Sequence, residues 1–201
     1  MTTETTRIEP TVDVSDIELP AALGAAIGKY FGVGTVRTAA DWLDALETGL
    51  DTSGDPISVE DLCTTADSPH VLDTAAGTQA YQCATDPMIV PFLTDEPATV
   101  RSRCPISDEE VVFEIEDRAV HARPERAVFS LGIDLAASGD PPHSPAETYG
   151  IFCPSGNVFT SRDAYEQWAA DTEAITTRLP LEHGVAVVGA LASRLSDPAG
   201  D

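Results

Sequence analysis

Basic residues are scarce in this chain of 201 residues, which has 11 Lys and Arg against 34 Asp and Glu. Only one of the 11 is a lysine, Lys29, and only Arg7 and Arg37 accompany it in the first 100 residues. DNA, RNA and anionic membranes all bind proteins through basic surfaces that meet their phosphates. The net charge of −23 therefore argues against each of these partners, including DNA bound by a regulator through its helical N-terminal region.

An acidic excess of this size is typical either of a disordered chain or of a folded protein whose surface is adapted to high salt. The apolar share of 42% is enough for a packed core, and the acidic residues are spread along the whole chain rather than collected in a tail. We therefore expect a folded protein from a halophilic source, in which salt screens the repulsion between surface carboxylates.

Long apolar runs are also missing from the sequence. No segment approaches the about 18 consecutive apolar residues of a membrane span, and the first ten residues lack the basic and apolar regions of a secretory signal. We therefore expect a cytoplasmic protein. In that compartment the four cysteines are more often free, metal-binding or catalytic than disulfide-bonded.

Several familiar motifs are absent: the phosphate-binding glycine-rich loops, the nucleophile elbow, the zinc-binding His-Glu-x-x-His helix and the Cys-x-x-Cys pair. Nucleotide chemistry and a zinc finger are therefore disfavoured. The histidines stand apart without the spacing of metal ligands, and each is interpreted as a surface or capped core residue. They are His70, His121, His143 and His183.

The first third of the chain has the periodicity of helices. A helix is predicted over residues 19–31, ended by Gly32. Two further helices are predicted after capping-box patterns, in which a Ser or Thr is followed three residues later by Asp; the pairs are Thr38 with Asp41, and Ser58 with Asp61. The last of these helices is short and extends through Cys63.

Most of the remaining chain has the composition of strands, with turn residues between them. Residues 67–79 are interpreted as a loop. Strands are predicted over residues 99–103, 111–115, 119–122, 127–133, 148–153 and 158–160. Helices are predicted after Thr160, with Tyr165 and Trp168 on the inner face, and over residues 184–195.

These elements predict an α+β fold, in which a small N-terminal three-helix unit is followed by an antiparallel β core with C-terminal helices. The chain divides into four parts on this basis. They are a disordered tail (1–16), a helical N-terminal domain (17–66), an α+β domain that carries the chemistry (67–195) and a second tail (196–201).

The join between the helical and strand-rich regions contains a thiol and a carboxyl three residues apart, Cys83 and Asp86. A thiolate can attack a soft electrophile or bind a soft metal, and a nearby carboxyl can donate or accept the proton. Because Pro87 follows Asp86, extended backbone is predicted at this carboxyl. Cys153 also lies at an expected element end beside a turn. The remaining cysteines, Cys63 and Cys104, are interpreted as small buried hydrophobic residues.

The residues of this join carry a resemblance to a known family. Gln82-Cys83-Ala84-Thr85-Asp86 resembles the Cys-Ala-x-Asp element of the organomercurial (alkylmercury) lyases, and Pro91-Phe92 follows at a similar distance to that family's Phe-Pro. Residues 100–104 are similar to its strand ending in a structural cysteine. Ile151-Phe152-Cys153, ahead of the helix with Trp168, resembles its Phe-Cys segment. The ordered match covers residues 80–195 and suggests a haloarchaeal-like member.

The resemblance implies that Cys83 and Cys153 bind mercury as a pair of thiolates and that Asp86 is the proton carrier. It further implies that Cys83 attacks first, that Cys153 completes the pair, and that the products are a hydrocarbon and a bound mercuric ion. Elementary chemistry agrees, because two thiolates are the ligands that soft mercury prefers. A carboxyl with a pKa raised by burial can take the proton of a thiol and deliver it to the departing carbon.

The family resemblance also implies the partners of the reaction. The substrate is a small organomercurial, a thiol serves as reductant, a mercuric reductase is a possible acceptor of Hg(II), and no cofactor is expected. The three-helix unit corresponds to a shorter version of the family's winged-helix-like domain. The chain departs from the family at Pro154, where a second cysteine is common, and at Ser155-Gly156-Asn157, which replaces an aromatic and histidine-containing run.

A second hypothesis comes from a different functional class. The same scaffold can be a non-catalytic binding protein that holds mercury, copper(I) or zinc through Cys83, Cys153 and Asp86. Release of hydrocarbon from an organomercurial in excess thiol distinguishes the two hypotheses.

Overall fold

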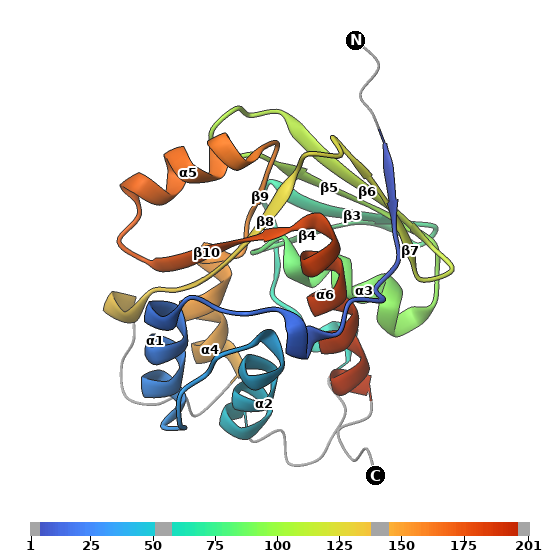
Figure 1. The fold of residues 1–201 in the computed structure, drawn as a ribbon. Coiled ribbons are helices and arrows are strands. Elements are labelled where there is room, and N and C mark those ends of the chain that lie inside the picture. Colours follow the sequence, from blue (N-terminus) through green and yellow to red (C-terminus); the bar gives the residue numbers. More distant parts are fainter. Residues whose placement is uncertain (1–4, 51–57, 138–144, 197–201) are drawn as a thin grey trace.

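The structure is a computed structural model that describes residues 5–50, 58–137 and 145–196. Its strands form two antiparallel sheets (Figure 1). The larger sheet has the strand order β1-β7-β6-β5-β3-β4-β2, and the smaller has the order β10-β8-β9. The strands are β1 (Thr6–Ile8), β2 (Thr64–Thr65), β3 (His70–Thr74), β4 (Gly77–Tyr81), β5 (Ala98–Arg103), β6 (Glu110–Glu116), β7 (Ala119–Arg123), β8 (Val128–Ile133), β9 (Val158–Phe159) and β10 (Ile175–Pro180).

Helices pack against both sheets. They are α1 (Ala21–Phe31), α2 (Ala39–Leu50), α3 (Thr85–Thr94), α4 (Pro145–Phe152), α5 (Arg162–Asp171) and α6 (Leu181–Ser196). Helices α1 and α5 pack against the smaller sheet, on either side of β10 in the view of Figure 1. Helix α6 packs against α3 and also contacts β8 and β10, so it joins the two sheets into one core. None of the described helices is long and apolar enough to cross a membrane.

The two long N-terminal helices are found where the sequence predicts them. Helix α1 ends at Gly32, whose φ of 66° is the left-handed conformation that glycine adopts without steric cost. Before α2, the Asp41 N–H donates to Thr38 Oγ1 over 3.1 Å and the Thr38 N–H donates to Asp41 Oδ2 over 3.1 Å, which is the predicted capping box.

The predicted third helix is only a 3-10 turn, η2 (Val59–Asp61), although its Ser58–Asp61 capping box is present. Leu62 already has extended backbone, with ψ of 152°, because the chain turns here into β2. Cys63 therefore lies after the turn and before a strand, rather than inside a helix.

The predicted mobile tail is wrong where the structure describes it. Residues 6–8 form β1, which pairs with β7 in the register Thr6 with Ala122 and Ile8 with Val120. Short polar segments carry no periodicity of their own, and β1 is an edge strand whose pairing is supplied by β7. Residues 1–4 of the first tail, His143, and residues 197–201 of the second tail lie outside the described part of the chain.

The four strands predicted between residues 99 and 133 are confirmed as β5 to β8. The loop predicted over residues 67–79 is wrong, because β3 and β4 form a hairpin there. In β4 only Tyr81 is buried, so this strand lacks the apolar alternation that identifies strands from sequence. It forms a strand because its backbone pairs with β3, and β3 is itself paired with β5.

The strand predicted over residues 148–153 is a helix instead. Its aromatic and β-branched residues favour a strand locally. However, the buried Thr148 and Ile151 are spaced for one face of α4, and that face packs against β8. The overall α+β class is confirmed, whereas the division of the chain into domains at residue 66 stays a prediction.

Candidate active site

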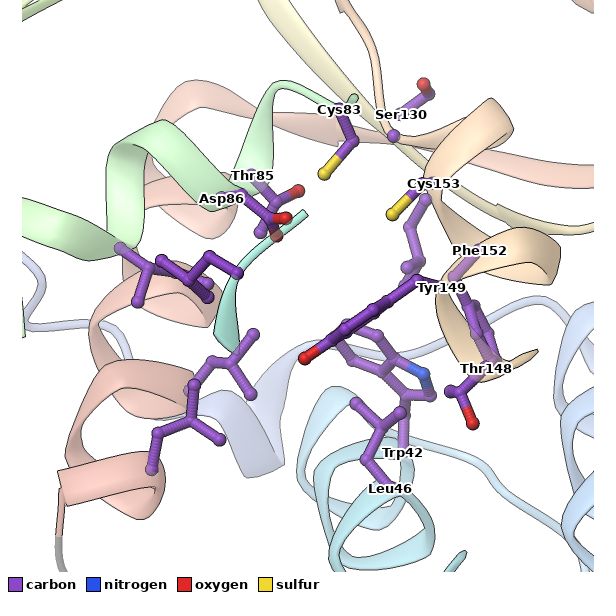
Figure 2. Close-up of a pocket in the computed structure, with 16 residues that line it drawn as sticks. Trp42, Leu46, Cys83, Thr85, Asp86, Ser130, Thr148, Tyr149, Phe152 and Cys153 are labelled. Carbon is purple, nitrogen blue, oxygen red and sulfur yellow. The ribbon is translucent and has the colours of Figure 1, made fainter. Parts of the chain in front are cut away.

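A cavity of about 90 Å³ lies where α2, α3, α4, β8 and α6 meet (Figure 2). Its wall is mostly apolar, and Cys83, Asp86 and Cys153 lie together at one end of it. Among the described residues that line the cavity, none is Lys, Arg or His. The apolar wall includes Trp42, Leu46, Leu62, Ile89, Leu131 and Leu191.

Cys83 and Asp86 are positioned by the start of α3. The chain leaves β4 at Tyr81 and enters α3 at Thr85, so Cys83 lies in the connection and Asp86 in the first helical turn. The prediction of extended backbone at Asp86 is wrong. Pro87 is the third residue of the helix, where its missing N–H has no intrahelical partner to lose. Both side chains are buried, with 3% of Cys83 and 5% of Asp86 exposed.

The environment of Asp86 raises the affinity of its carboxylate for a proton. Burial raises the pKa of this carboxyl, and hydrogen bonds from the Cys63 N–H and the Cys83 thiol oppose the shift only in part. The backbone bond is 2.9 Å long and ends on Oδ2. A carboxyl of raised pKa next to a thiol is suited to carry a proton between sulfur and a second atom.

Cys153 reaches the same place from a distant part of the sequence. It begins the 3-10 turn η4 (Cys153–Ser155) directly after α4, so it follows a helix rather than the predicted strand. Hydrogen bonding with the Cys63 and Cys83 thiols, followed by burial, raises the pKa of the Cys153 thiol. The sulfurs of Cys83 and Cys153 point into the same space in Figure 2.

The loop after Cys153 is tied to both neighbouring elements. The Ser130 hydroxyl of β8 donates to the Ser155 carbonyl over 2.6 Å, and the Ala84 N–H donates to the Gly156 carbonyl over 2.8 Å. A Cβ at Gly156 would lie 3.2 Å from the Cβ of Cys83. The absence of a side chain at residue 156 is therefore what allows this loop to approach Cys83 so closely.

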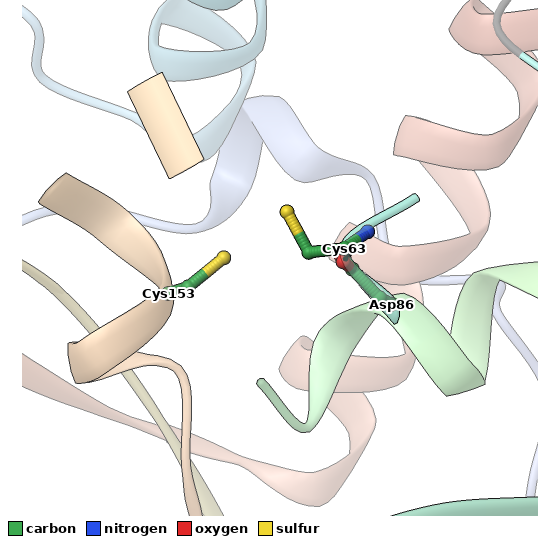
Figure 3. Close-up of side chains that lie close together, drawn as sticks. All are labelled: Cys63, Asp86 and Cys153. Atoms are coloured by element: carbon green, nitrogen blue, oxygen red, sulfur yellow. Dashed lines mark hydrogen bonds between the residues drawn. The ribbon is translucent and has the colours of Figure 1, made fainter. Parts of the chain in front are cut away.

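Two residues of the site have no signal in the sequence. Tyr149 of α4 lines the cavity, and burial followed by the charge of Asp86 raises the pKa of its hydroxyl. Cys63, interpreted above as a small buried residue, is only partly buried. Its Sγ, the Sγ of Cys153 and a carboxylate oxygen of Asp86 lie within 4.8 Å of one another (Figure 3). Cys63 is separated from Cys83 by 19 residues, and only the fold brings them together.

The other candidate residues lie elsewhere. Cys104 is buried in a separate small cluster with Val128, Phe159 and Tyr165, consistent with a packing role. His70 is buried with Nδ1 3.1 Å from the Ser102 hydroxyl, as a capped core histidine would be.

Comparison with known proteins places this site in context. Residues 63–193 match the family profile described as alkylmercury lyase. Among solved structures, the mercury-bound form of MerB2 is similar with a TM-score of 0.50 and 12% sequence identity, over 89% of this chain and 93% of that one. At that identity the structural likeness speaks for the fold alone. No curated protein sequence matches the chain.

Proposed function

This chain belongs to the alkylmercury lyase family, and from that premise we propose that it cleaves carbon–mercury bonds by protonolysis, with Cys83, Asp86 and Cys153 as its catalytic residues. The observation that carries the proposal is the meeting of two buried thiols with a buried carboxyl of raised pKa at the end of an apolar cavity. The thiols match the soft metal, and the cavity matches the organic group.

The first half of the reaction loads mercury onto sulfur. The Cys83 sulfur attacks the organomercurial, and its proton leaves with the ligand that mercury carried, which is displaced. The Cys153 sulfur then forms the second sulfur–mercury bond, and its proton passes to the Asp86 carboxylate. The raised pKa of Cys153 supports this order, because its thiol keeps the proton until mercury arrives as a counter-charge.

The second half transfers the proton to carbon. Two thiolates push electron density onto mercury and weaken its bond to carbon. Asp86 delivers its proton to that carbon, the carbon–mercury bond breaks, and a hydrocarbon leaves while Hg(II) remains on the two sulfurs. An external thiol then removes the ion, and a mercuric reductase is the acceptor that we propose. The steps need no cofactor.

The test is release of hydrocarbon from phenylmercury or methylmercury by the purified chain in excess glutathione, measured by headspace gas chromatography. We expect repeated turnovers for the wild type and none for Cys83→Ser, which lacks the first nucleophile. Tight binding of Hg(II) without any hydrocarbon would instead support the soft-metal binding protein, the alternative favoured by the cluster of Cys63, Asp86 and Cys153.

A further inference from the structure

Cys63 is held in the site by its backbone on both sides. Its N–H donates to Asp86 Oδ2 over 2.9 Å, and its carbonyl accepts the Gln82 N–H over 2.9 Å. These two bonds tie Cys63 to the segment that carries Cys83 and Asp86. The position of its side chain is therefore set by the same structure that sets the other two.

The Cys63 side chain faces Cys153 across the site (Figure 3). Its sulfur and the Cys153 sulfur are no more than 4.8 Å apart. The Cys83 sulfur points into the same space as the Cys153 sulfur (Figure 2). Cys153 thus faces two thiols that come from different segments, one before β2 and one before α3.

This arrangement matches a three-coordinate soft metal. Taking a metal–sulfur bond of about 2.3 Å, the zinc value, as a lower scale, three sulfurs around one ion lie about 4 Å apart. The Cys63 and Cys153 sulfurs, at most 4.8 Å apart, therefore need only small side-chain rotations to share an ion, and Cys83 lines the same cavity. Because no basic side chain is among the described residues lining the cavity, a bound cation is the natural counter-charge for thiolates here.

We propose that Cys63 is a third mercury ligand, so that the mercuric product is held by the sulfurs of Cys63, Cys83 and Cys153. The inference rests on the proposed function for the identity of the metal. After the hydrocarbon leaves, Asp86 is a carboxylate and Hg(II) carries two thiolates. The Cys63 S–H bond breaks, its proton goes to the Asp86 carboxylate, and the sulfur electron pair forms a third sulfur–mercury bond. No atom changes oxidation state.

A third ligand changes how the mercuric product is held, and not how the carbon–mercury bond is cleaved. A third thiolate holds Hg(II) more firmly against water and weak ligands, and Asp86 keeps the released proton until Cys63 takes it back as the ion leaves. Removal of the ion then requires attack by an external thiol. The site is therefore both the place of cleavage and a temporary store for the ion.

The experiment adds HgCl2 to the reduced full chain, freed of small thiols, and counts the sulfurs around mercury by X-ray absorption spectroscopy. We expect three sulfurs in the wild type and two in Cys63→Ser, with Hg(II) retention against glutathione lower by about tenfold or more, as for loss of groups that support a metal site. Cys104→Ser is the matched control, because Cys104 is buried outside the site, and it should keep three sulfurs. Circular dichroism verifies that each variant is folded.

Two sulfurs in the wild type, with an unchanged spectrum in Cys63→Ser, would overturn the inference. The hydrocarbon assay on the wild type reports separately on the proposed function. Three sulfurs without hydrocarbon release would leave Cys63 as a ligand and refute the lyase activity. Hydrocarbon release with only two sulfurs around mercury would support the lyase activity and refute Cys63 as a ligand.

Discussion

Asp86 is the residue at which burial and function meet most directly. A carboxyl with only 5% exposure has lost most of its hydration, and the two hydrogen bonds that it accepts do not restore its ordinary pKa. Burial of this carboxyl therefore costs folding free energy, at a position where a neutral acid can serve as a proton donor. The proposed role of Asp86 as proton carrier would account for a burial that does not stabilise the fold.

Replacing Asp86 with Asn tests its role as proton carrier. The amide keeps an oxygen that can accept the Cys63 N–H, but it has no proton of suitable acidity. We expect hydrocarbon release to fall by about 10²-fold to 10⁴-fold, the range for a general acid, with Hg(II) binding retained. Single-turnover gas chromatography and mercury retention on a desalting column measure the two properties. Full turnover by Asp86→Asn would refute the assignment.

The lowered pKa of His70 predicts how the free energy of unfolding depends on pH. Burial lowers its pKa from 6.5 to about 4, so the folded protein keeps it neutral. Below pH 6.5 the unfolded chain takes up a proton that the folded protein does not. The free energy of unfolding therefore falls as the pH drops from 6.5 toward 4, by about 3 kcal/mol at most, and this contribution is fully present above pH 6.5.

Urea unfolding at pH 7 and pH 5, at constant salt, measures this effect. We expect His70→Gln to lose less stability than the wild type between the two values, because the amide does not titrate. The carboxyls, including Asp86 with its opposite shift, are common to both proteins and cancel in the comparison. Equal losses in the two proteins would show that His70 does not contribute.

At the scale of elements, the site depends on how closely the turn after α4 approaches the start of α3. The Ala84 N–H and the Ser130 hydroxyl hold the loop carbonyls, and Gly156 provides the space. The φ of Gly156 is −88°, which any residue adopts. The constraint at this position is therefore the contact with Cys83 and not the backbone conformation.

Gly156→Ala tests this approach. The new Cβ would lie 3.2 Å from the Cβ of Cys83, so the loop or the cysteine must shift by a few tenths of an ångström. We expect kcat/KM to fall by about tenfold, since small misplacements of reacting groups are costly. Gly150→Ala in α4 is the control, because nothing lies within 4 Å of its Cβ and helical Ala is favoured by about 1 kcal/mol. Unchanged kcat/KM in Gly156→Ala would contradict the argument.

At the scale of the whole molecule, charge is the dominant feature. The 34 acidic residues outnumber the 11 basic ones, so most carboxylates have no cationic partner. Among the described residues, the paired side chains are all at least a quarter exposed, as in Arg123 with Glu114, whose side chains are 40% and 53% accessible. Each such pair contributes about 1 kcal/mol or less. Repulsion among the remaining carboxylates is therefore reduced mainly by screening from dissolved ions.

The thermal midpoint should consequently rise with salt. The screening length falls from about 8 Å at 0.15 M to about 3 Å at 1 M, which weakens repulsion between neighbouring carboxylates. Scanning calorimetry in 0.1 M and 2 M KCl measures the change, and each 1 kcal/mol gained appears as about 2–4 °C for a chain of this size. A protein of near-neutral charge in the same buffers is the control. Equal midpoints would rule out the halophilic surface.

The sequence by itself determined the elements whose patterns are local. Helices α1, α2 and α6 follow from apolar periodicity, and the capping boxes at Thr38 and Ser58 follow from hydrogen bonds between residues three apart. Strands β5 to β8 alternate or are continuously apolar, so their composition identifies them. The pairing of Cys83 with Asp86 was predictable for the same reason, because three residues of one chain cannot lie far apart.

Only the tertiary structure decided the features that depend on contacts between distant segments. Strands β1 and β4 carry little apolar signal and are ordered by the strands beside them. Helix α4 overrides its local strand preference because one of its faces is buried against β8. Cys63 reaches the site across a long stretch of sequence that holds no trace of the approach. Burial, which raises the pKa of Asp86, exists only once those segments have packed together.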